Sequence, residues 1–431
     1  MFTRGFVVLW VAMLVAMAGI GMVSPLLPVY VRDTLHGPAI GVALSFSGLA
    51  LGQMTASPFV GRLGDTIGTK PFIVAGFFVY AVGAVGYVFA PTWHVVVFFR
   101  ILCGFGAAGI FPMALAYVGR MAPSGREGAF MGAFGIAQML GFGLGPLFGG
   151  GVRDALGPNA AFTAMAVLLG GTGIATLLLL PPERVRAASP RRADSHAEGG
   201  AARASWWSLL SRPAVQAAVT VQFVASLGWG AASSFLGVYV ISGDGLGTDS
   251  ALFVGVILAT RSLLSAALQP VFGPLADRAN RLALVVAGLT VAAALQYAVP
   301  SLPRTLWHGE VLGEAITIAP WLLATMAVIG IAEAMSLPAQ QAIFVTVGRH
   351  VGMSSIMGLN QLGNSTGFLS GSLVGALVVS TWGLDAVFRY AGVVTLAGAV
   401  AFAVLMLRAR DELRAVEDGA RAAARESATS A

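Results

Sequence analysis

The sequence predicts an all-α membrane protein whose twelve transmembrane helices form two pseudo-symmetric six-helix bundles. Three observations carry this prediction. First, the 431 residues are 57% hydrophobic and only 10% charged, whereas soluble domains usually have about 25% charged residues. Second, apolar blocks of spanning length recur along the whole chain. Third, the second half of the chain repeats features of the first half. Such a chain needs lipid as its solvent.

Twelve apolar blocks are expected to cross the membrane, because each is long enough to span the hydrocarbon core. They comprise residues 5–31, 38–60, 71–91, 93–119, 127–152, 158–181, 213–241, 249–272, 282–302, 318–346, 352–380 and 383–407. Strands of a β-barrel are excluded, because these blocks are too long and lack alternation of polar and apolar residues. The first block resembles a secretory signal around Ala16, but it continues to Val31. We therefore predict an uncleaved first helix.

One long polar segment separates the sixth block from the seventh, and it sets the predicted organisation of the chain. We expect an N-terminal six-helix bundle over residues 1–182, a cytoplasmic linker over 183–212, a C-terminal six-helix bundle over 213–408 and a cytoplasmic tail over 409–431. If the N-terminus is cytoplasmic, 19 of the 25 Lys and Arg residues fall on the cytoplasmic side and four fall outside. The positive-inside rule thus predicts an inner-membrane protein with both termini in the cytoplasm.

The two halves of the chain repeat each other in parallel. A first repeat alignment places 58–65 on 270–277, so that Asp65 corresponds to Asp277. A second repeat alignment, with a larger offset, places Pro112 on Pro338 and the glycines 141, 145 and 149 on 367, 371 and 375. The change of offset predicts an insertion near 303–317. Repeated bundles of this kind favour a transporter whose halves rock about a substrate site between them near the midplane.

Four short motifs resemble those of the major facilitator superfamily, over roughly residues 18–410. They comprise Gly61-x-Leu63-x-Asp65-x-x-Gly68-x-Lys70, Arg100-x-x-x-Gly104-x-Gly106, Gly141-x-x-x-Gly145-Pro146-x-x-Gly149-Gly150, and Gly19 followed by Pro25 and Pro28 in the first helix. The third resembles the antiporter motif, and the fourth is similar to a motif typical of the twelve-span drug:proton antiporters. Thr66 and Thr69 stand where the family favours Arg, so the charge network of the first motif is thinner here.

The first motif has two interpretations. The resemblance implies a conformational latch formed by Gly61, Asp65, Gly68, Lys70, Arg120 and Asp277. In the family, the matching Asp interacts with helix eleven and with an Arg at the inner end of helix four, which resembles Arg120. A negative charge near the positive N-terminus of a helix is stabilising, and the contact would break when the transporter opens inward. The alternative is a positively charged turn with a capping Asp.

The glycine motif of the fifth helix also has two interpretations. Gly141, Gly145 and Gly149 share one helix face, and Pro146 interrupts the backbone hydrogen bonds beside them; Gly150 completes the motif. The glycines predict a close helix–helix contact. The resemblance implies that this contact is with helix eight and limits proton leak.

Arg100, Arg261 and Glu333 are ionisable residues deep inside predicted spans, where burial of a charge is costly. Arg261 and Glu333 are expected at similar depths, so they could pair. One hypothesis is a fixed ion pair that neutralises both charges. The other is that Glu333 exchanges protons or meets a cationic substrate, with Arg261 and Arg100 taking part in proton coupling.

Polar and aromatic residues inside the spans form the candidate substrate cavity, namely Gln53, Trp229, Glu333, Gln340, Asn360 and Asn364. Aromatic residues are common in membrane helices, so Trp229 could equally serve packing.

The sequence therefore predicts a proton-coupled transporter that exports small amphipathic compounds by alternating access. The alternative is a carrier of another solute, acting in sugar or metabolite efflux, lipid translocation or uptake. An enzyme is not expected, because no His/Cys cluster has metal-ligand spacing, and the absence of a phosphate-binding GxxxxGK[ST] loop argues against an ATP-driven pump. We expect no metal and no cofactor. The partners expected are a small-molecule substrate, protons and the lipid bilayer, but no nucleic acid, since the basic residues are scattered. We also expect a monomer.

Overall fold

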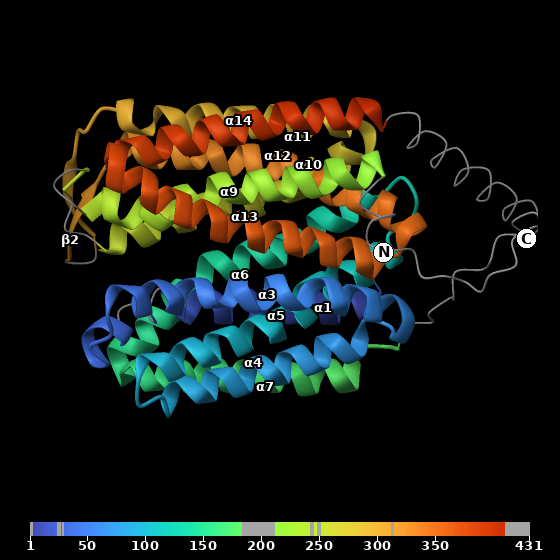
Figure 1. Ribbon diagram of the computed structural model, residues 1–431, viewed down its shortest axis with the longest axis horizontal. Helices are drawn as coiled ribbons and strands as arrows, with labels where there is room; N and C mark the ends of the chain where they lie inside the picture. The colour runs from blue at the N-terminus through green and yellow to red at the C-terminus, as the bar shows by residue number, and fades with distance from the viewer. Residues whose placement is uncertain are drawn as a thin grey trace, which may run out of the picture.

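The computed structural model describes residues 3–23, 27, 30–182, 212–241, 245–247, 251–311 and 314–409. Within these residues, twelve long helices form two groups of six, which we call the N-terminal and C-terminal halves (Figure 1). The N-terminal half contains α1 (Arg4–Val23), α3 (Ala39–Ile67), α4 (Lys70–Val88), α5 (Trp93–Met121), α6 (Glu127–Leu156) and α7 (Pro158–Leu179). The C-terminal half contains α9 (Pro213–Ile241), α10 (Ala251–Arg278), α11 (Arg281–Ala298), α12 (Pro320–Val351), α13 (Met353–Trp382) and α14 (Leu384–Arg408). The prediction of twelve helices is confirmed.

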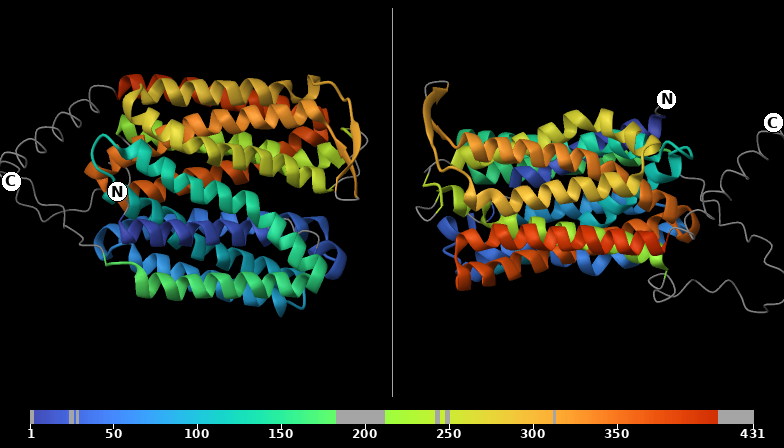
Figure 2. Two further views of the ribbon diagram at one scale, coloured as in Figure 1. Left: turned by 180° about the vertical axis from the view of Figure 1, so that it is seen from behind. Right: turned by 90° about the horizontal axis from the view of Figure 1, so that it is seen from above.

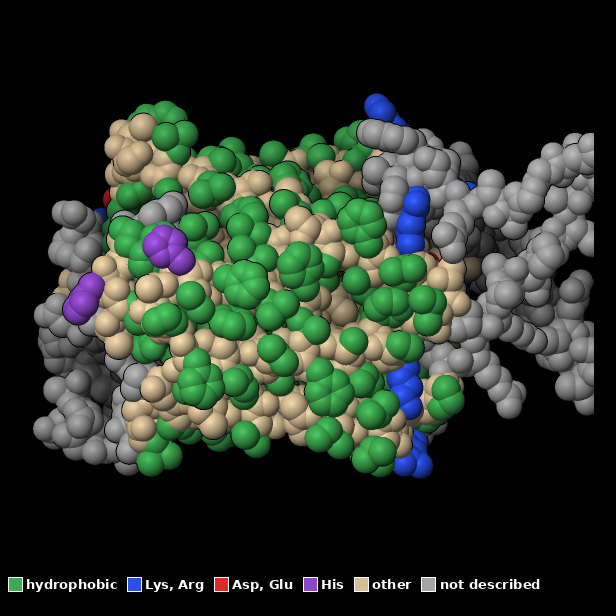
Figure 3. Space-filling view, turned by 60° about the horizontal axis from the view of Figure 1, so that its bottom comes forward, with side chains coloured by type: hydrophobic (Ala, Val, Ile, Leu, Met, Phe, Trp, Pro, Cys, Tyr) green, Lys and Arg blue, Asp and Glu red, His purple; other side chains and the backbone are tan. Residues whose placement is uncertain are grey.

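The outer surface of the bundle fits a lipid environment. Eleven of the twelve helices are long and apolar enough to cross a membrane; the exception is α3, some of whose side chains lie outside the described residues. Large apolar side chains are exposed on the outer faces of the helices, for example Phe59, Phe148, Val167 and Leu377. Figure 3 shows hydrophobic side chains over the middle of one face and Lys or Arg side chains in a row near one end. This pattern matches a multi-pass membrane protein.

Short elements between the long helices refine the predicted spans and the predicted insertion. The first predicted span, 5–31, contains all of α1 except Arg4 and the beginning of a π-helical turn, η1 (Tyr30–Thr34); Pro25 and Pro28 lie outside the described residues. The insertion predicted near 303–317 contains an antiparallel hairpin of β1 (Trp307–Val311) and β2 (Glu314–Ile318), which follows the 3₁₀ turn η2 (Val299–Ser301). The sequence analysis did not predict these strands.

Both described ends of the chain lie at the same end of the molecule (Figure 1). Helix α1 begins there and α14 finishes there, whereas the β-hairpin lies at the opposite end. We call these the latch end and the hairpin end. The predicted linker, 183–212, and the predicted tail, 409–431, fall outside the described residues apart from Arg212 and Ala409. Their roles, and the domain boundaries, stay predictions.

The most extensive contacts between the halves are made by two helix pairs, α3 with α13 (Figure 1) and α6 with α10 (Figure 2). In addition, α5 contacts α13 and α6 contacts α12. We call the first two contacts the α3–α13 seam and the α6–α10 seam. Glycines allow close approach in both. A Cβ atom on Gly61 would stand 2.8 Å from the carbonyl oxygen of Ser354, and one on Gly132 would stand 3.0 Å from the Cα of Gly273. Since Gly273 corresponds to Gly61 in the first repeat alignment, the two seams are built alike.

Candidate functional site

A cavity of about 160 Å³ lies in the C-terminal half. Its lining residues come from α9, α10, α11, α12, α13 and α14, and all of them belong to that half. The polar part of the lining consists of Gln222, Ser226, Trp229, Arg261, Gln296, Glu333, Ser336, Gln340, Asn364 and Thr395. The sequence analysis expected a substrate site between the two halves. This cavity lies instead among the six C-terminal helices.

An ion pair forms the charged part of the cavity. Arg261 of α10 donates to Glu333 of α12 through two parallel hydrogen bonds, Nε to Oε2 at 3.0 Å and Nη2 to Oε1 at 3.1 Å. The Arg261 side chain is 11% exposed and the Glu333 side chain 26%. The Arg261 guanidinium also lies over the ring of Trp229 on α9, 3.3 Å from its centroid. Such bidentate and cation–π contacts hold a guanidinium in one orientation.

Backbone packing places this ion pair. Gly330 lies nearly one turn before Glu333 on α12, and a Cβ there would stand 2.5 Å from the Arg261 carbonyl oxygen. The missing side chain lets α12 approach α10 at the level of Arg261, which brings the carboxylate within reach of the guanidinium. Both charges are then neutralised in a site largely removed from water, where a lone charge would be costly.

Uncharged polar groups continue the lining from α9 to α13. The Gln222 side-chain amide donates to the Ser226 hydroxyl at 3.2 Å, and that hydroxyl donates to Oδ1 of Asn364 at 2.6 Å. A small apolar pocket adjoins the cavity, sharing Trp229, Gln296 and Ile329 with it, and is lined further by Leu236, Met326 and Phe388. The site therefore has a charged, polar part and an adjoining apolar part.

Four of the six predicted cavity residues line the cavity: Trp229, Glu333, Gln340 and Asn364. The other two do not. Gln53 is buried in the α3–α13 seam, where its Oε1 accepts a hydrogen bond from the Ser365 hydroxyl at 3.3 Å. Asn360 lies one turn from Asn364 toward the latch end of α13 and is also buried, outside the lining.

Arg100, predicted to take part in proton coupling, lies in the N-terminal half. It is buried in α5, 1% exposed, and its electrostatic neighbours are Tyr80 and Tyr87 of α4 and Cys103. A Cβ on Gly48 of α3 would stand 3.3 Å from its Cγ. Arg100 is therefore embedded between α3, α4 and α5, and it does not line the cavity that contains Arg261 and Glu333.

Asp65 joins the halves at the latch end. Its carboxylate accepts the backbone N–H groups of Ser354 and Ser355 in the first turn of α13, both at 2.8 Å. The Arg120 guanidinium donates to Asp65 at 2.8 Å and to the Ser354 hydroxyl at 2.6 Å. A carboxylate supplied by one half thus caps a helix of the other half, where the helix dipole favours negative charge. We call these contacts the α3 latch.

Three glycines shape the α3 latch. Gly352, just before α13, has a φ of 117°, and a Cβ there would collide with the Asp65 carboxylate. Gly61 provides the close approach of α3 to α13, and Gly68 ends α3 with a φ of 95°. Lys70 takes another direction, because its ammonium group donates to the Leu180 carbonyl within the N-terminal half at 2.5 Å. The structure therefore does not place Lys70 in a contact between the halves.

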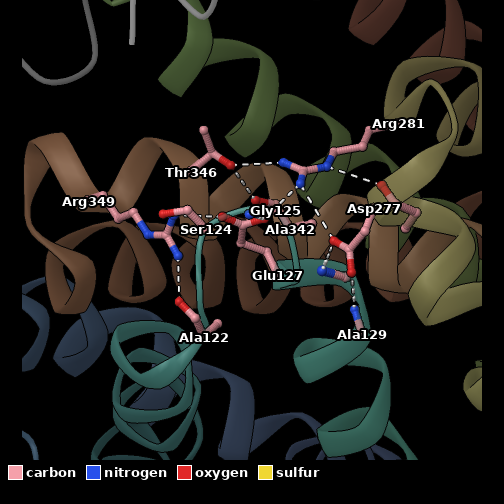
Figure 4. Close-up of polar contacts among 12 residues, drawn as sticks. Ala122, Ser124, Gly125, Glu127, Ala129, Asp277, Arg281, Ala342, Thr346 and Arg349 are labelled. Carbon is pink, nitrogen blue, oxygen red and sulfur yellow. Dashed lines mark hydrogen bonds and ion pairs between the residues drawn. The ribbon is translucent and has the colours of Figure 1, made fainter. Parts of the chain in front are cut away.

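Asp277 forms the equivalent contact in the other seam. Its carboxylate accepts the N–H groups of Gly128, at 2.6 Å, and Ala129, at 2.9 Å, in the first turn of α6 (Figure 4). Arg281 lies 3.7 Å from Asp277. In the two repeat alignments, Asp277, Gly128 and Ala129 correspond to Asp65, Ser354 and Ser355. The capping arrangement is therefore duplicated with the fold.

Glu127, the first residue of α6, adds a charge cluster to this second contact. It is only 3% exposed, and it accepts hydrogen bonds from two arginines of the C-terminal half, Arg281 at 2.9 Å and Arg349 at 2.6 Å (Figure 4). Arg281 also donates to Thr346, and Arg349 to Ser124 and the Ala122 carbonyl. We call these contacts, with Asp277, the α10 latch. The sequence analysis missed Glu127, Arg281 and Arg349, although Glu127 follows a turn and begins a helix, a typical position for a charge at a helix N-terminus.

The glycine motif packs against a different helix from the one the resemblance implied. Cβ atoms on Gly141, Gly145 and Gly149 would collide with the carbonyl oxygens of Leu14, Ala18 and Met22, all in α1. The Cδ of Pro146 also lies near Gly21 of α1. The expected contact with helix eight, α10, is therefore corrected to α1; other residues of α6, including Gly128, Gly132 and Gly143, face α10. Gly150 lies outside the residues whose surroundings the structure describes.

Comparisons with known proteins bear on this architecture. Residues 9–313 and 248–429 match the sequence profile of the Major Facilitator Superfamily. The chain is 25% identical to the multidrug resistance protein MdtG of Enterobacter lignolyticus, over 92% of this chain and 91% of MdtG. It is 36% identical to an uncharacterized MFS-type transporter of Methanocaldococcus jannaschii, but over only 36% of this chain and 40% of that protein. The fold resembles the human organic anion transporter MFSD10, with a TM-score of 0.71 and 16% identity, over 93% of this chain and 99% of the other.

Proposed function

From the premise that the chain belongs to the Major Facilitator Superfamily, we propose that it exports small amphipathic compounds by alternating access in exchange for protons. The observation that carries this proposal is the Arg261–Glu333 ion pair, which lies at the edge of a cavity with a polar and an apolar part. An acid kept inside a membrane protein is costly, and such acids are commonly part of proton or substrate pathways. The similarity to MdtG, a multidrug resistance protein, supports export.

Proton coupling follows from a choice of partners for Glu333. Arg261 keeps its positive charge at any physiological pH. The Glu333 carboxylate can be neutralised by Arg261, by a proton or by a cationic group of the substrate. Because a proton and such a substrate compete for one carboxylate, binding of one favours release of the other. A carrier with that competition exchanges protons for substrate across the membrane.

The two latches support alternating access. Both join the halves at the latch end, and both use charges that contact a helix terminus of the opposite half. In this structure the latch end is closed. We propose that the latch end faces the cytoplasm, that the protein is a monomer of the inner membrane, and that the latches break when the site opens inward. The row of Lys and Arg side chains near the latch end in Figure 3 agrees with the positive-inside rule.

A second candidate function is the transport of an organic anion. Arg261 is a permanent cation on the cavity wall, and its guanidinium matches a carboxylate in geometry. An anion that displaced Glu333 from Arg261 would leave a neutral site only if Glu333 took up a proton. Proton and anion would then bind together and move in the same direction. The similarity in fold to the human organic anion transporter MFSD10 favours keeping this alternative.

Flux into liposomes containing the purified protein distinguishes these functions. Two probes are followed under an imposed pH gradient, ethidium as a lipophilic cation and radiolabelled benzoate as an anion. The proposal expects ethidium to move against the proton flux, and Glu333→Gln to abolish this coupling while passive exchange persists. The anion alternative expects benzoate to move with the protons.

Asp385→Asn is the matched control, because Asp385 pairs with Arg304 in an exposed ion pair at 3.3 Å, outside the cavity. This variant should transport like the unmodified protein. Proton-driven ethidium flux that survives Glu333→Gln would refute the role of Glu333.

A further inference from the structure

Helix α10 carries a polar stripe that runs from the cavity to the α10 latch. Arg261, Ser265, Gln269 and Asp277 are spaced by multiples of four residues, so they form a row that winds gradually around the helix from the cavity side to the side that faces α6. The two ends of the stripe are satisfied, since Arg261 binds Glu333 and Asp277 caps α6. The middle of the stripe faces α6, where a Cβ on Gly135 would stand 3.0 Å from both amide heavy atoms of Gln269.

The middle of this stripe has no hydrogen-bond partners in the part of the chain that the structure describes. Gln269 is 1% exposed and Ser265 is 0% exposed. Among the described residues, the side-chain nitrogen and oxygen of Gln269 have no hydrogen-bond partner, and neither does the hydroxyl of Ser265. Buried polar groups in proteins are nearly always hydrogen-bonded, so two neighbouring exceptions in one seam call for a physical reason.

The α3–α13 seam shows the same positions in a satisfied form. In the first repeat alignment, Gln53 corresponds to Ser265 and Ser57 to Gln269. The Ser57 hydroxyl donates to the Gln53 carbonyl at 2.6 Å, and Gln53 accepts from Ser365, which in turn accepts from Gln361 at 3.1 Å.

The opposing helices explain the difference between the seams. In the second repeat alignment, Gln361 and Ser365 of α13 correspond to Gly135 and Met139 of α6. Helix α6 therefore offers no polar side chain at the two positions where α13 supplies one. The polar groups of α10 are retained, whereas α6 has Gly135 and Met139 where α13 supplies polar partners.

We propose that Gln269 and Ser265 lower the stability of the closed α6–α10 seam. They thereby oppose the stabilisation of the closed state by the latches and allow the seam to open. Water can hydrate both side chains when the seam separates, whereas closing it removes that hydration without replacing it. The α10 latch adds ion pairs that favour closure. A transporter can cycle only if its closed and open states remain close in free energy.

Distances between spin labels test this proposal. The labels are placed at Leu63 on α3 and Leu275 on α10, two exposed positions near the latch end of opposite halves, in a Cys103→Ala background. Gln269→Met keeps the length of the side chain but removes the unpartnered amide. We expect it to decrease the ratio of open to closed molecules at least about fivefold, and to raise the temperature of unfolding.

Gln53→Met is the matched control in the other seam, because it removes a group that does have a partner. It should increase the open population. Ser265→Ala, a smaller change, should shift the population in the same direction as Gln269→Met and covers the case in which Gln269→Met folds poorly. The proposal is overturned if Gln269→Met or Ser265→Ala increases the open population or leaves it unchanged, or if Gln53→Met and Gln269→Met act in the same direction. Because no substrate or pH gradient is used, failure here is distinct from failure of the proposed transport function.

Discussion

The two halves of the molecule share one backbone arrangement and differ in the chemistry placed on it. Gly104 of α5 and Gly330 of α12 correspond in the second repeat alignment. Each lies where a Cβ would collide with a carbonyl oxygen of the neighbouring helix, that of Leu49 in the N-terminal half and that of Arg261 in the C-terminal half. Leu49 and Arg261 are themselves equivalent in the first repeat alignment. The same close helix contact thus presents leucine in one half and arginine in the other.

The charged residues deep inside the spans do not occupy equivalent positions in the two halves, in contrast to Asp65 and Asp277 at the latch end. Glu333 corresponds to Ala107, and Arg100 corresponds to Met326. The C-terminal half therefore has an ion pair beside a cavity, whereas the N-terminal half has a buried arginine among tyrosines. The comparison teaches that the repeated scaffold determines helix packing, while a few unrepeated side chains distinguish the half that contains the candidate site.

The largest expected effect comes from making the C-terminal half resemble the N-terminal half one residue at a time. Glu333→Ala, which copies Ala107, leaves Arg261 without its carboxylate and should lower the free energy of unfolding by about 3–5 kcal/mol. The double variant Glu333→Ala with Arg261→Leu restores the apolar pair of the N-terminal half and should recover most of that loss. Thermal unfolding in detergent measures both. If the double variant is no more stable than Glu333→Ala alone, then Arg261 and Glu333 do not compensate for each other's buried charge.

A second comparison concerns the two latches. Glu127 is buried between two arginines, whereas Asp65 has one arginine and is about one-fifth exposed. Glu127→Gln should therefore destabilise the latch-closed state by about 2–4 kcal/mol, because two guanidinium groups lose their counter-charge together. The spin-label distance between Leu63 and Leu275 should lengthen accordingly. An unchanged distance would mean that the α10 latch does not hold the halves together.

Asp65→Asn should have a smaller effect, about 1–2 kcal/mol on the latch-closed state, because the amide still offers one acceptor to the α13 N-terminus and the lost charge is partly hydrated. Transport should suffer more than thermal stability, since the contact joins the halves in one state only. Measuring both in the same preparation tests this. If purified Asp65→Asn transports normally, the α3 latch is a plain helix cap.

The smallest effect is expected at the exposed pair of Arg304 and Asp385 near the hairpin end. Both side chains are more than 40% exposed, so solvent screens their interaction. Asp385→Asn should change the free energy of unfolding by less than about 1 kcal/mol. If Asp385→Asn lowers the free energy of unfolding as much as Glu333→Ala does, then solvent exposure does not explain why the two charged residues differ in their effect on stability.

The sequence alone determined the helices and the repeat, whereas the contacts of Asp65 with Arg120 and α13 were expected from the resemblance to the superfamily. Block length sets the number of spans, because a helix must cover the hydrocarbon core. The first repeat alignment correctly paired Asp65 with Asp277, and both cap helices of the opposite half. Similar depths in neighbouring spans were enough to suggest that Arg261 and Glu333 meet.

Only the tertiary structure decided which helix faces meet. In water, an apolar stripe marks the side of a helix that faces the core, but in a membrane the lipid-facing side is apolar as well. Periodicity therefore could not reveal that Gly141 and its neighbours pack on α1, or that Gln53 lies in a seam rather than in the cavity. Glu127 was missed for a related reason: its two arginines come from distant positions in the chain, and only the packing of the halves brings them together.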